Sequence, residues 1–316
     1  MPSLNETKYP QSSLIADIND GKSFVKVVPE NIGDLIYFDS DEPRAEPLAD
    51  SVYATRKIIT AIISIALIVV IWYFLTSIGW QIVLSLAILF FGGLIFLGQG
   101  FGGDDYFVGT EGFAKYHFSK NRENVDSKEE HRYDDGFLLV HHEVRQYKNG
   151  SYDRTEFSFT YIGKPNQEGI ASTIIEEYGS YNCEEGGNNT GEADYDYWCR
   201  IEDEITSKYL IAAQNLLDAG HSVPIFVTLK QNDNTWKTGA VIHLAPGVIK
   251  YGDKTYTQED LKRVYIDKGV VYLEDNNYSS KLMGLKKTGE KIALPLEMIG
   301  NRKAFIILLS KLYGIQ

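Results

Sequence analysis

The chain has 316 residues, a formal net charge of −12, 44% hydrophobic residues and two cysteines. This acidic balance excludes a chain built chiefly to bind nucleic acid, and two cysteines are too few for a disulfide-stapled secreted fold. The length leaves room for two modest soluble domains beside a membrane segment.

Residues 1–56 form an acidic N-terminal arm that holds 10 Asp and Glu against 5 Lys and Arg. Its first twenty residues are polar and lack an apolar period, which predicts a largely flexible segment. Ser23–Val28 and Leu35–Phe38 are short strand-like runs, separated by Pro29 and Gly33. No activity is assigned to this arm.

From Ile58 to Gly98 the chain carries no charged residue and no histidine. One membrane span needs roughly 20 apolar residues, so this stretch is long enough for two spans. Thr76–Gly79 interrupts the run with small and polar residues. The pattern predicts helices at Ile58–Leu75 and Trp80–Leu97, which together form a two-helix transmembrane hairpin within residues 57–99.

Two other kinds of segment share this apolar pattern with a transmembrane hairpin. A signal peptide is excluded because the apolar run begins more than fifty residues into the chain. A helical hairpin buried in a soluble protein is the remaining alternative. Arg56 and Lys57 precede the first helix and the connecting turn is uncharged, so the positive-inside tendency places both flanking parts in the cytoplasm.

Residues 104–220 contain strand-like runs. Gly112–Phe118 alternates in polarity, and Gly136–Tyr147 and Ser151–Ile162 are joined at Lys148–Gly150. The Asn-Gly pair in that connection is the strongest short-range signal for a β-hairpin, because both residues tolerate positive φ. The sequence therefore predicts a small β-rich domain.

An acidic loop and a helix end this region. The loop runs from Glu184 to Asp196, and Cys183 and Cys199 flank it; in a reducing compartment both are expected as free thiols. Apolar residues then recur at three- and four-residue spacing from Tyr195 to Ala219, which predicts a helix, and Gly220 is its expected stop.

Residues 221–316 repeat the order of strands followed by a helix. Short strand-like runs lie at Val223–Leu229, Ala240–Leu244, Gly247–Tyr251, Lys254–Thr257, Leu261–Asp267 and Val270–Glu274. The last two are expected to pair as a hairpin, and Lys281–Leu285 is expected to pair with Lys291–Leu294. Asn301 is expected to cap a terminal helix whose apolar face lies on the sheet.

Short motifs in both copies carry a resemblance. In the second copy they are Gly247-Val-Ile-Lys-Tyr-Gly-Asp-Lys, Leu261-Lys-Arg-Val and Ile299-Gly-Asn-Arg-Lys-Ala-Phe. In the first they are Thr110-Glu-Gly-Phe, Asp134-Asp-Gly, Tyr147-Lys-Asn-Gly-Ser-Tyr and Leu217-Asp-Ala-Gly. The second copy resembles bacterial pleckstrin-homology-like domains. The first is similar to an uncharacterised family of membrane-anchored bacterial proteins that carries such domains.

The resemblance implies a fold and a location. Each pleckstrin-homology-like domain is a strongly bent seven-stranded barrel, closed by a C-terminal helix, that binds lipids, peptides or proteins and is rarely an enzyme. The expected fold is therefore an α+β membrane protein in which the hairpin is followed by two tandem pleckstrin-homology-like β-barrel domains, at 104–220 and 221–316. The expected location is the bacterial inner membrane, with the N- and C-terminal parts cytoplasmic.

His141, His142 and Glu143 form the most tempting chemical cluster. Adjacent residues on a strand point to opposite faces, so only His141 and Glu143 share a face, and two ligands are too few for a metal site. The sequence has no phosphate-binding glycine loop and no Gly-x-Ser-x-Gly elbow. We therefore expect no metal, no cofactor, no catalytic residue and no enzymatic activity.

The C-terminal third is basic: residues 235–316 hold 13 Lys and Arg against 8 Asp and Glu. A basic domain beside a membrane anchor favours contact with anionic lipid headgroups or an acidic protein partner. The candidate contact residues are Lys254, Lys262, Arg263, Lys268, Lys286 and Lys287. The sequence thus predicts a non-catalytic, membrane-anchored binding or scaffold protein.

Four alternatives stay open. The basic surface is a solvated face without a ligand, or the protein is a structural or signalling subunit of a membrane complex. A hairpin that forms homo-oligomers and a membrane-perturbing effector are the other two.

Overall fold

The structure is a computed structural model that describes residues 15–18, 21, 25–42, 50–97, 102–119, 122–182, 193–232, 234–281 and 286–315. The chain forms two compact units, which are described separately below. The first comprises Met1–Glu30, Leu35–Phe107 and Ala114–Glu130, and the second comprises Asn31–Asp34, Val108–Phe113 and His131–Gln316.

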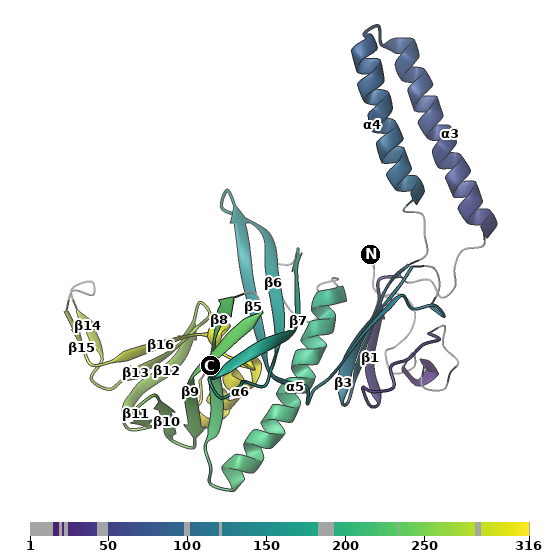
Figure 1. Ribbon diagram of the computed structural model, residues 1–316. Helices are drawn as coiled ribbons and strands as arrows, with labels where there is room; N and C mark the ends of the chain where they lie inside the picture. The colour runs from purple at the N-terminus through teal and green to yellow at the C-terminus, as the bar shows by residue number, and fades with distance from the viewer. Residues whose placement is uncertain are drawn as a thin grey trace. The chain divides into compact units, whose positions relative to one another are not determined.

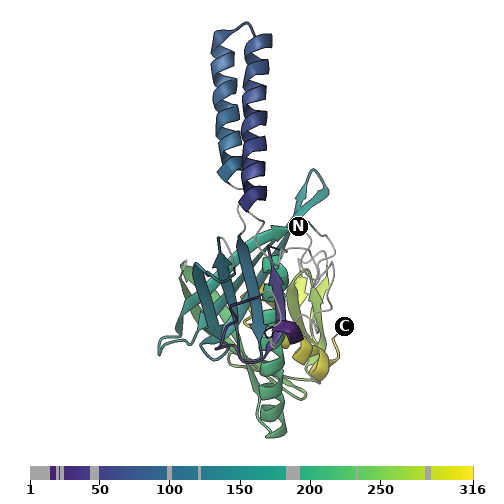
Figure 2. The same cartoon turned by 90° about the vertical axis from the view of Figure 1, so that its right-hand side faces the viewer.

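Two helices of the first unit run side by side in both views (Figures 1 and 2). They are α3 (Asp50–Phe74) and α4 (Ile78–Leu97), so the break falls where the sequence predicts it. α3 begins eight residues before the predicted start, because no glycine or proline stops the helix there. Its segment Ala54–Phe74 is exposed and, by length and composition, could cross a membrane. α4 contributes a shorter apolar stretch, Ile78–Gly93.

The turn between these helices is held by one polar side chain. Gln81 is only 7% exposed, and its Nε2 donates hydrogen bonds to the carbonyl oxygens of Leu75 and, at 3.3 Å, Trp72. The last carbonyls of a helix have no partner within it, and leaving them unpaired in an apolar medium is costly. Trp72 Nε1 also donates to Ser85 Oγ at 3.1 Å. Two carbonyl groups at this turn thus have a side-chain partner within the hairpin.

A four-stranded sheet follows the hairpin in the chain. Its strands, in spatial order, are β1 (Leu35–Ser40), β2 (Gly103–Gly109), β3 (Gly112–Phe118) and β4 (Ser127–Arg132). β1 confirms the predicted strand-like run Leu35–Phe38 in the N-terminal arm, whereas Val25–Val28, within the first strand-like run, is not a strand. The ring of Phe107 lies 5.1 Å from that of Phe38 and 5.2 Å from that of Tyr116, which gives this sheet an aromatic core.

A seven-stranded antiparallel sheet dominates the second unit. Its strands are β5 (Gly136–Lys148), β6 (Ser151–Gly163), β7 (Ile170–Tyr181), β8 (Val223–Asn232), β9 (Thr235–Ala245), β10 (Val248–Tyr251) and β11 (Lys254–Thr257). The order is β11-β10-β9-β7-β6-β5, and β8 pairs with β9. Because β7 pairs with β9, strands from both predicted copies share this sheet. The boundary between 104–220 and 221–316 stays a prediction.

Two smaller sheets lie in the same unit. β12 (Leu261–Asp267), β13 (Val270–Asp275) and β16 (Lys291–Pro295) form one, and β14 (Ser279–Lys281) and β15 (Lys286–Thr288) form the other. The predicted pairing of Lys281–Leu285 with Lys291–Leu294 is wrong, because β16 pairs with β13 and Lys281 with Lys286. Residues 282–285 lie outside the described part. The observed pairing of β16 with β13 is favoured by burial of apolar side chains. Ile292 and Leu294 lie opposite Leu273 and Val271, and all four face the core.

No closed barrel is found in the part of the chain that the structure describes, so the predicted barrels are corrected to open antiparallel sheets. A barrel requires the first and last strands of a sheet to pair, whereas β5 and β11 lie at opposite edges here. β9 pairs along one edge with both β10 and β7, and β7 belongs to the other predicted domain. The strands of 221–316 therefore do not form a separate closed barrel. The fold is α+β, with apolar N-terminal helices followed by sheets and further helices.

Helix α5 (Ala193–Asp218) contributes to two cores of the second unit. Near its N-terminus Trp198 stacks on Phe159 of β6, with ring centroids 5.7 Å apart. Near its C-terminus Ala213 belongs to a larger core formed by β8, β9, β10, β13, β16 and α6 (Arg302–Tyr313). The predicted stop is confirmed, since Gly220 has φ +76° and the next residue bonds back to the Leu216 carbonyl.

Asn301 lies at the start of α6, as predicted, but its side chain makes no capping hydrogen bond. Its φ is +53°, and its Oδ1 instead accepts a hydrogen bond from the backbone N–H of Leu139 on β5, at 2.9 Å. The Asn301 N–H donates to the Leu139 carbonyl in return. Asn301 therefore acts as a short strand partner for β5.

Candidate functional site

The outer face of the β12–β13–β16 sheet carries the most charged and aromatic arrangement near the predicted basic residues. Arg263 lies opposite Glu274, and Tyr265 lies opposite Tyr272. Lys291 lies opposite Glu274 on the other side of β13. Side chains two residues apart on a strand share a face, so these five form one patch, which we call the Glu274 cluster.

Glu274 is the hub of this cluster and is only 1% exposed, because the other side chains cover it. Arg263 donates to its carboxylate through Nε at 2.6 Å and Nη2 at 3.2 Å, and the Tyr265 hydroxyl donates at 2.9 Å. Lys291 Nζ forms an ion pair with it at 3.3 Å. Hydrogen bonding from Arg263 outweighs the opposing effect of burial and lowers the pKa of Glu274 to about 2.

Aromatic rings support both cations of the cluster. The Arg263 guanidinium lies 4.4 Å from the centroid of the Tyr265 ring, and Lys291 Nζ lies 3.8 Å from that of Tyr272. The two tyrosine rings stack on each other at 5.1 Å. Cation–π contacts of this kind help to hold long basic side chains in place. Two cations against one carboxylate leave the cluster with a net charge of +1.

The six predicted contact residues have different environments. Arg263 belongs to the Glu274 cluster, and Lys254 on β11 forms an ion pair with Glu290. Lys262 and Lys268 are exposed, and no ion pair is found for either one among the described residues. Lys268 follows the last residue of β12, in the turn before β13, where its φ is +48°. Lys286 and Lys287 lie on β15, and their side chains fall outside the described part.

Sequence reasoning missed Lys291, Glu274 and the two tyrosines of this cluster. The signal was present as period-two alternation, since Arg263 and Tyr265 alternate with the core residues Val264 and Ile266. The predicted turn at Lys268–Gly269 sets Glu274 opposite Arg263, whereas the pairing of β16 with β13, which brings Lys291 to Glu274, has no local signal.

The low pKa of Glu274 yields a testable pH dependence. An unfolded Glu titrates near its ordinary value of 4.5, so its stabilising effect is fully present above pH 4.5 and is lost as the pH falls toward 2. Glu274→Gln removes this contribution, which is at most about 3 kcal/mol and smaller where solvent screens Arg263. We expect wild type to exceed the variant in free energy of unfolding at pH 7 and to lose about half of that advantage by pH 3, measured by denaturant titration. An equal difference at both pH values would contradict this.

The His141 cluster lies elsewhere in the second unit. As strand alternation predicts, His141 and Glu143 share one face, whereas His142 points away to Glu297, 3.1 Å distant. His141 is 3% exposed and stacks on Phe159 at 3.9 Å. No group of three or more His, Cys, Asp or Glu side chains within the described residues is arranged to hold a metal ion.

His141 is held by residues from two helices. Its Nδ1 lies 3.1 Å from the Glu202 carboxylate of α5 and 2.8 Å from Arg302 Nη2 of α6, while Nε2 is buried without a hydrogen-bond partner. Burial lowers the pKa of His141, so the ring is neutral at pH 7. Burial raises the pKa of Glu202, but His141, Arg302 and Lys303 outweigh it and the net shift is downward. The cluster joins β5, α5 and α6.

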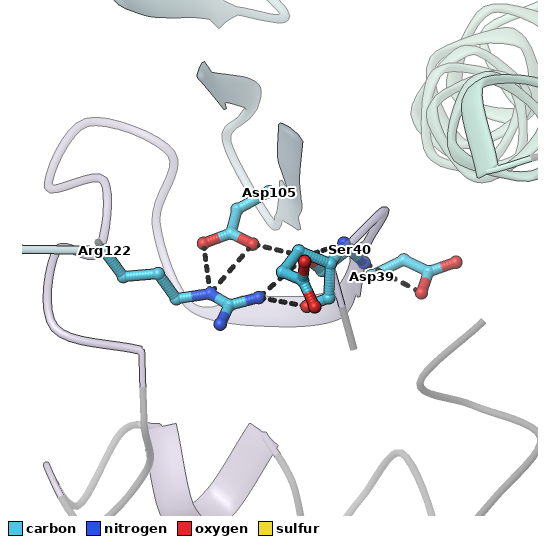
Figure 3. Close-up of polar contacts among 5 residues, drawn as sticks. Asp39, Ser40, Asp105 and Arg122 are labelled. Atoms are coloured by element: carbon cyan, nitrogen blue, oxygen red, sulfur yellow. Dashed lines mark hydrogen bonds and ion pairs between the residues drawn. The ribbon is translucent and has the colours of Figure 1, made fainter. Parts of the chain in front are cut away.

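A third polar cluster lies in the first unit (Figure 3). Arg122 is 4% exposed, and its Nε donates to both carboxylate oxygens of Asp105, at 3.0 and 3.2 Å. Its Nη2 donates to Ser40 Oγ at 2.9 Å and to the Glu42 carbonyl. Burial raises the pKa of Asp105 against the opposing charge of Arg122. This buried pair joins the end of β1 to β2.

Of the two cysteines that are predicted to be free thiols, the structure describes Cys199. Cys199 is buried and free, and burial raises the pKa of its thiol to about 12. Cys183 and most of the acidic loop lie outside the described residues.

Comparisons with protein-family models, with curated proteins and with solved structures found no match.

Proposed function

We propose that this chain is a non-catalytic, membrane-anchored binding protein, in which α3 and α4 form a two-span hairpin and the basic C-terminal region contacts anionic lipid. The observation that carries the proposal is the apolar hairpin. Side chains along both helices are exposed, including Ile65 and Leu86 at 61% each. Exposed apolar side chains of this number are costly in water and favourable in a bilayer.

The hydrogen bonds at the hairpin turn are a second observation that supports membrane insertion. Gln81 satisfies the carbonyl groups at the end of α3 internally. Backbone groups in hydrocarbon must find partners within the protein, because no water is available there. The Gln81 side chain of α4 meets that demand for the carbonyl groups of Trp72 and Leu75.

Lipid contact rests on the basic residues that keep their charge available. Glu274 and Glu290 neutralise Arg263 and Lys254 in part, which leaves Lys262 and Lys268 as the strongest candidates. Each basic side chain near an anionic membrane surface contributes about 1 kcal/mol, within roughly a Debye length.

Lysine acetylation tests this in the full-length protein, reconstituted in vesicles of neutral lipid or of neutral and anionic lipid mixed. We expect Lys262 and Lys268 to react about fivefold more slowly in anionic vesicles, since about 1 kcal/mol corresponds to that factor. The protection should vanish near 1 M salt, where the Debye length falls to about 3 Å.

Lys148, exposed at the tip of the β5–β6 hairpin, is the matched control and should react equally in both vesicle types. Lys262→Glu should weaken the protection of Lys268. Equal reactivity of all three lysines in both vesicle types would contradict the lipid-contact proposal. It would not bear on membrane insertion of the hairpin.

A structural subunit of a membrane complex is the second candidate. A groove of about 350 Å³ lies between α3 and α4, lined by apolar and small side chains that include Ile63, Ser64, Ala87 and Gly92. Small residues allow close approach of a further helix in membranes. Disulfide crosslinking of Ser64→Cys between copies in native membranes would favour this candidate.

A further inference from the structure

A hollow lined by polar side chains lies on the outer face of β5, β6 and β7, away from both clusters of the second unit described above. Its volume is about 540 Å³, within the range of roughly 300–1,000 Å³ that small-molecule sites occupy. It is lined by His142, Val144, Gln146, Arg154, Glu156, Phe157, Ser158, Tyr178, Gly179 and Ser180. We call it the β5–β7 hollow.

Strand register explains why the surface is concave. Ser158 lies between His142 and Tyr178, and Glu156 lies between Val144 and Ser180. Small side chains therefore sit beside larger ones across the three strands. The opposite face of the same strands is already occupied, because Phe157 and Phe159 pack there against α5. The hollow is thus a free surface of a sheet whose other face is buried.

The polar groups of the hollow form a flat, internally neutral row. Arg154 donates to Glu156 through Nε at 3.0 Å and Nη2 at 2.7 Å. Gln146 Nε2 donates to the other carboxylate oxygen of Glu156 at 3.1 Å. Hydrogen bonding from Arg154 lowers the pKa of Glu156, so both groups are ionised at pH 7. A ligand with a full charge of either sign would lie beside a side chain of the same charge here, which disfavours its binding.

Tyr178 supplies an aromatic platform beside that row. Its side chain is 71% exposed, and Ser158 and Ser180 add hydroxyl groups near it. An amphipathic ring next to amide, guanidinium and carboxylate groups matches a ligand with a flat C–H face and many hydroxyls.

From this combination we infer that the β5–β7 hollow binds an uncharged saccharide. The Tyr178 ring stacks on the C–H face of one sugar ring, and Gln146, Arg154 and Glu156 exchange hydrogen bonds with its hydroxyls. The sugar is either a free saccharide or the headgroup of a glycolipid, since both present the same chemistry.

The test uses full-length protein in phosphatidylcholine nanodiscs, because glycoside detergents would compete for the site. Saturation-transfer NMR is recorded with maltose, lactose, cellobiose and N,N′-diacetylchitobiose at concentrations up to about 10 mM, well beyond a Kd of about 1 mM. A parallel arm replaces the soluble sugars with nanodiscs that contain a diglucosyl lipid and measures protection of Tyr178 from iodination.

We expect binding in at least one arm, and the arm that responds identifies the source of the sugar. In the soluble-sugar arm Tyr178→Ala should weaken binding at least about tenfold, and in either arm Glu156→Gln should weaken it while keeping the fold. Tyr147→Ala is the matched control: Tyr147 is 55% exposed on β5 but does not line the hollow, so its loss should leave binding unchanged. Failure of both arms, or equal binding by Tyr178→Ala, overturns the inference, and neither outcome bears on anionic-lipid contact.

Discussion

Arg122→Met is expected to lower the free energy of opening of β2 and β3 by about 3–5 kcal/mol, because removing one partner of a buried ion pair leaves the other charge uncompensated. Asp105 is only 3% exposed, so water compensates little for the loss of the guanidinium. The Ser40 hydroxyl would remain as its partner, but a neutral donor replaces a cation poorly. The Arg122 guanidinium also lies 4.8 Å from the centroid of the Phe118 ring, and methionine loses this cation–π contact together with the ion pair.

Hydrogen exchange of β2 and β3 amides, followed by mass spectrometry on the full chain, gives this free energy locally. The double variant Arg122→Met with Asp105→Leu should recover most of the loss, because replacing a whole buried pair by apolar residues is often neutral. Arg154→Met is the surface control; its pair with Glu156 is about half exposed and screened by solvent, so its loss should cost far less than that of Arg122. A double variant as unstable as the single one would show that shape, rather than charge, explains the loss.

Sequence patterns predicted those elements whose signal is local. Asn149 and Gly150 both have positive φ, as the Asn-Gly turn requires, and the hairpin of β5 and β6 follows from them. The strands on either side of Lys268 and Gly269 are predicted on the same ground and are found. The apolar run from Ile58 likewise contains its own break near Thr76.

Elements that depend on distant partners escaped prediction. β4 (Ser127–Arg132) consists of polar and charged residues without apolar alternation, so nothing local marks it as a strand. The pairing of Ile170–Ser172 with Thr235–Lys237 joins segments more than sixty residues apart, and it merges strands that the sequence assigns to separate barrels. Such pairings are decided by tertiary packing, which overrides local preference.

The same limit applies to side-chain clusters. His141 and Glu143 could be placed on one strand face from their spacing, but their partners Glu202 and Arg302 lie on two later helices. The basic residues of the C-terminal third could be counted from the sequence. Their pairing with Glu274 and Glu290 depends on strand register and on the β16 position, which was mispredicted.

The second large effect concerns membrane insertion. Ile65→Arg combined with Leu86→Arg places one charge near the middle of each apolar helix, where both side chains are 61% exposed. An arginine at the centre of a membrane helix costs about 2.5–3.5 kcal/mol, so the pair costs about 5–7 kcal/mol. That shifts the partition between membrane and water by more than about a thousandfold.

We therefore expect wild type to stay in the membrane pellet after a carbonate wash and the double variant to be released or degraded. Ile211→Arg provides the matched control, since Ile211 is 63% exposed on α5, outside the hairpin, and should leave the protein in the pellet. The single variants distinguish an anchor of two spans from an anchor of one span. α4 is the helix in question, because its apolar stretch is the shorter one. If Leu86→Arg changes nothing while Ile65→Arg releases the protein, α3 alone is the anchor. Release of wild type by carbonate would instead place the hairpin outside the bilayer, and the exposed apolar faces of α3 and α4 would then have to be covered by protein.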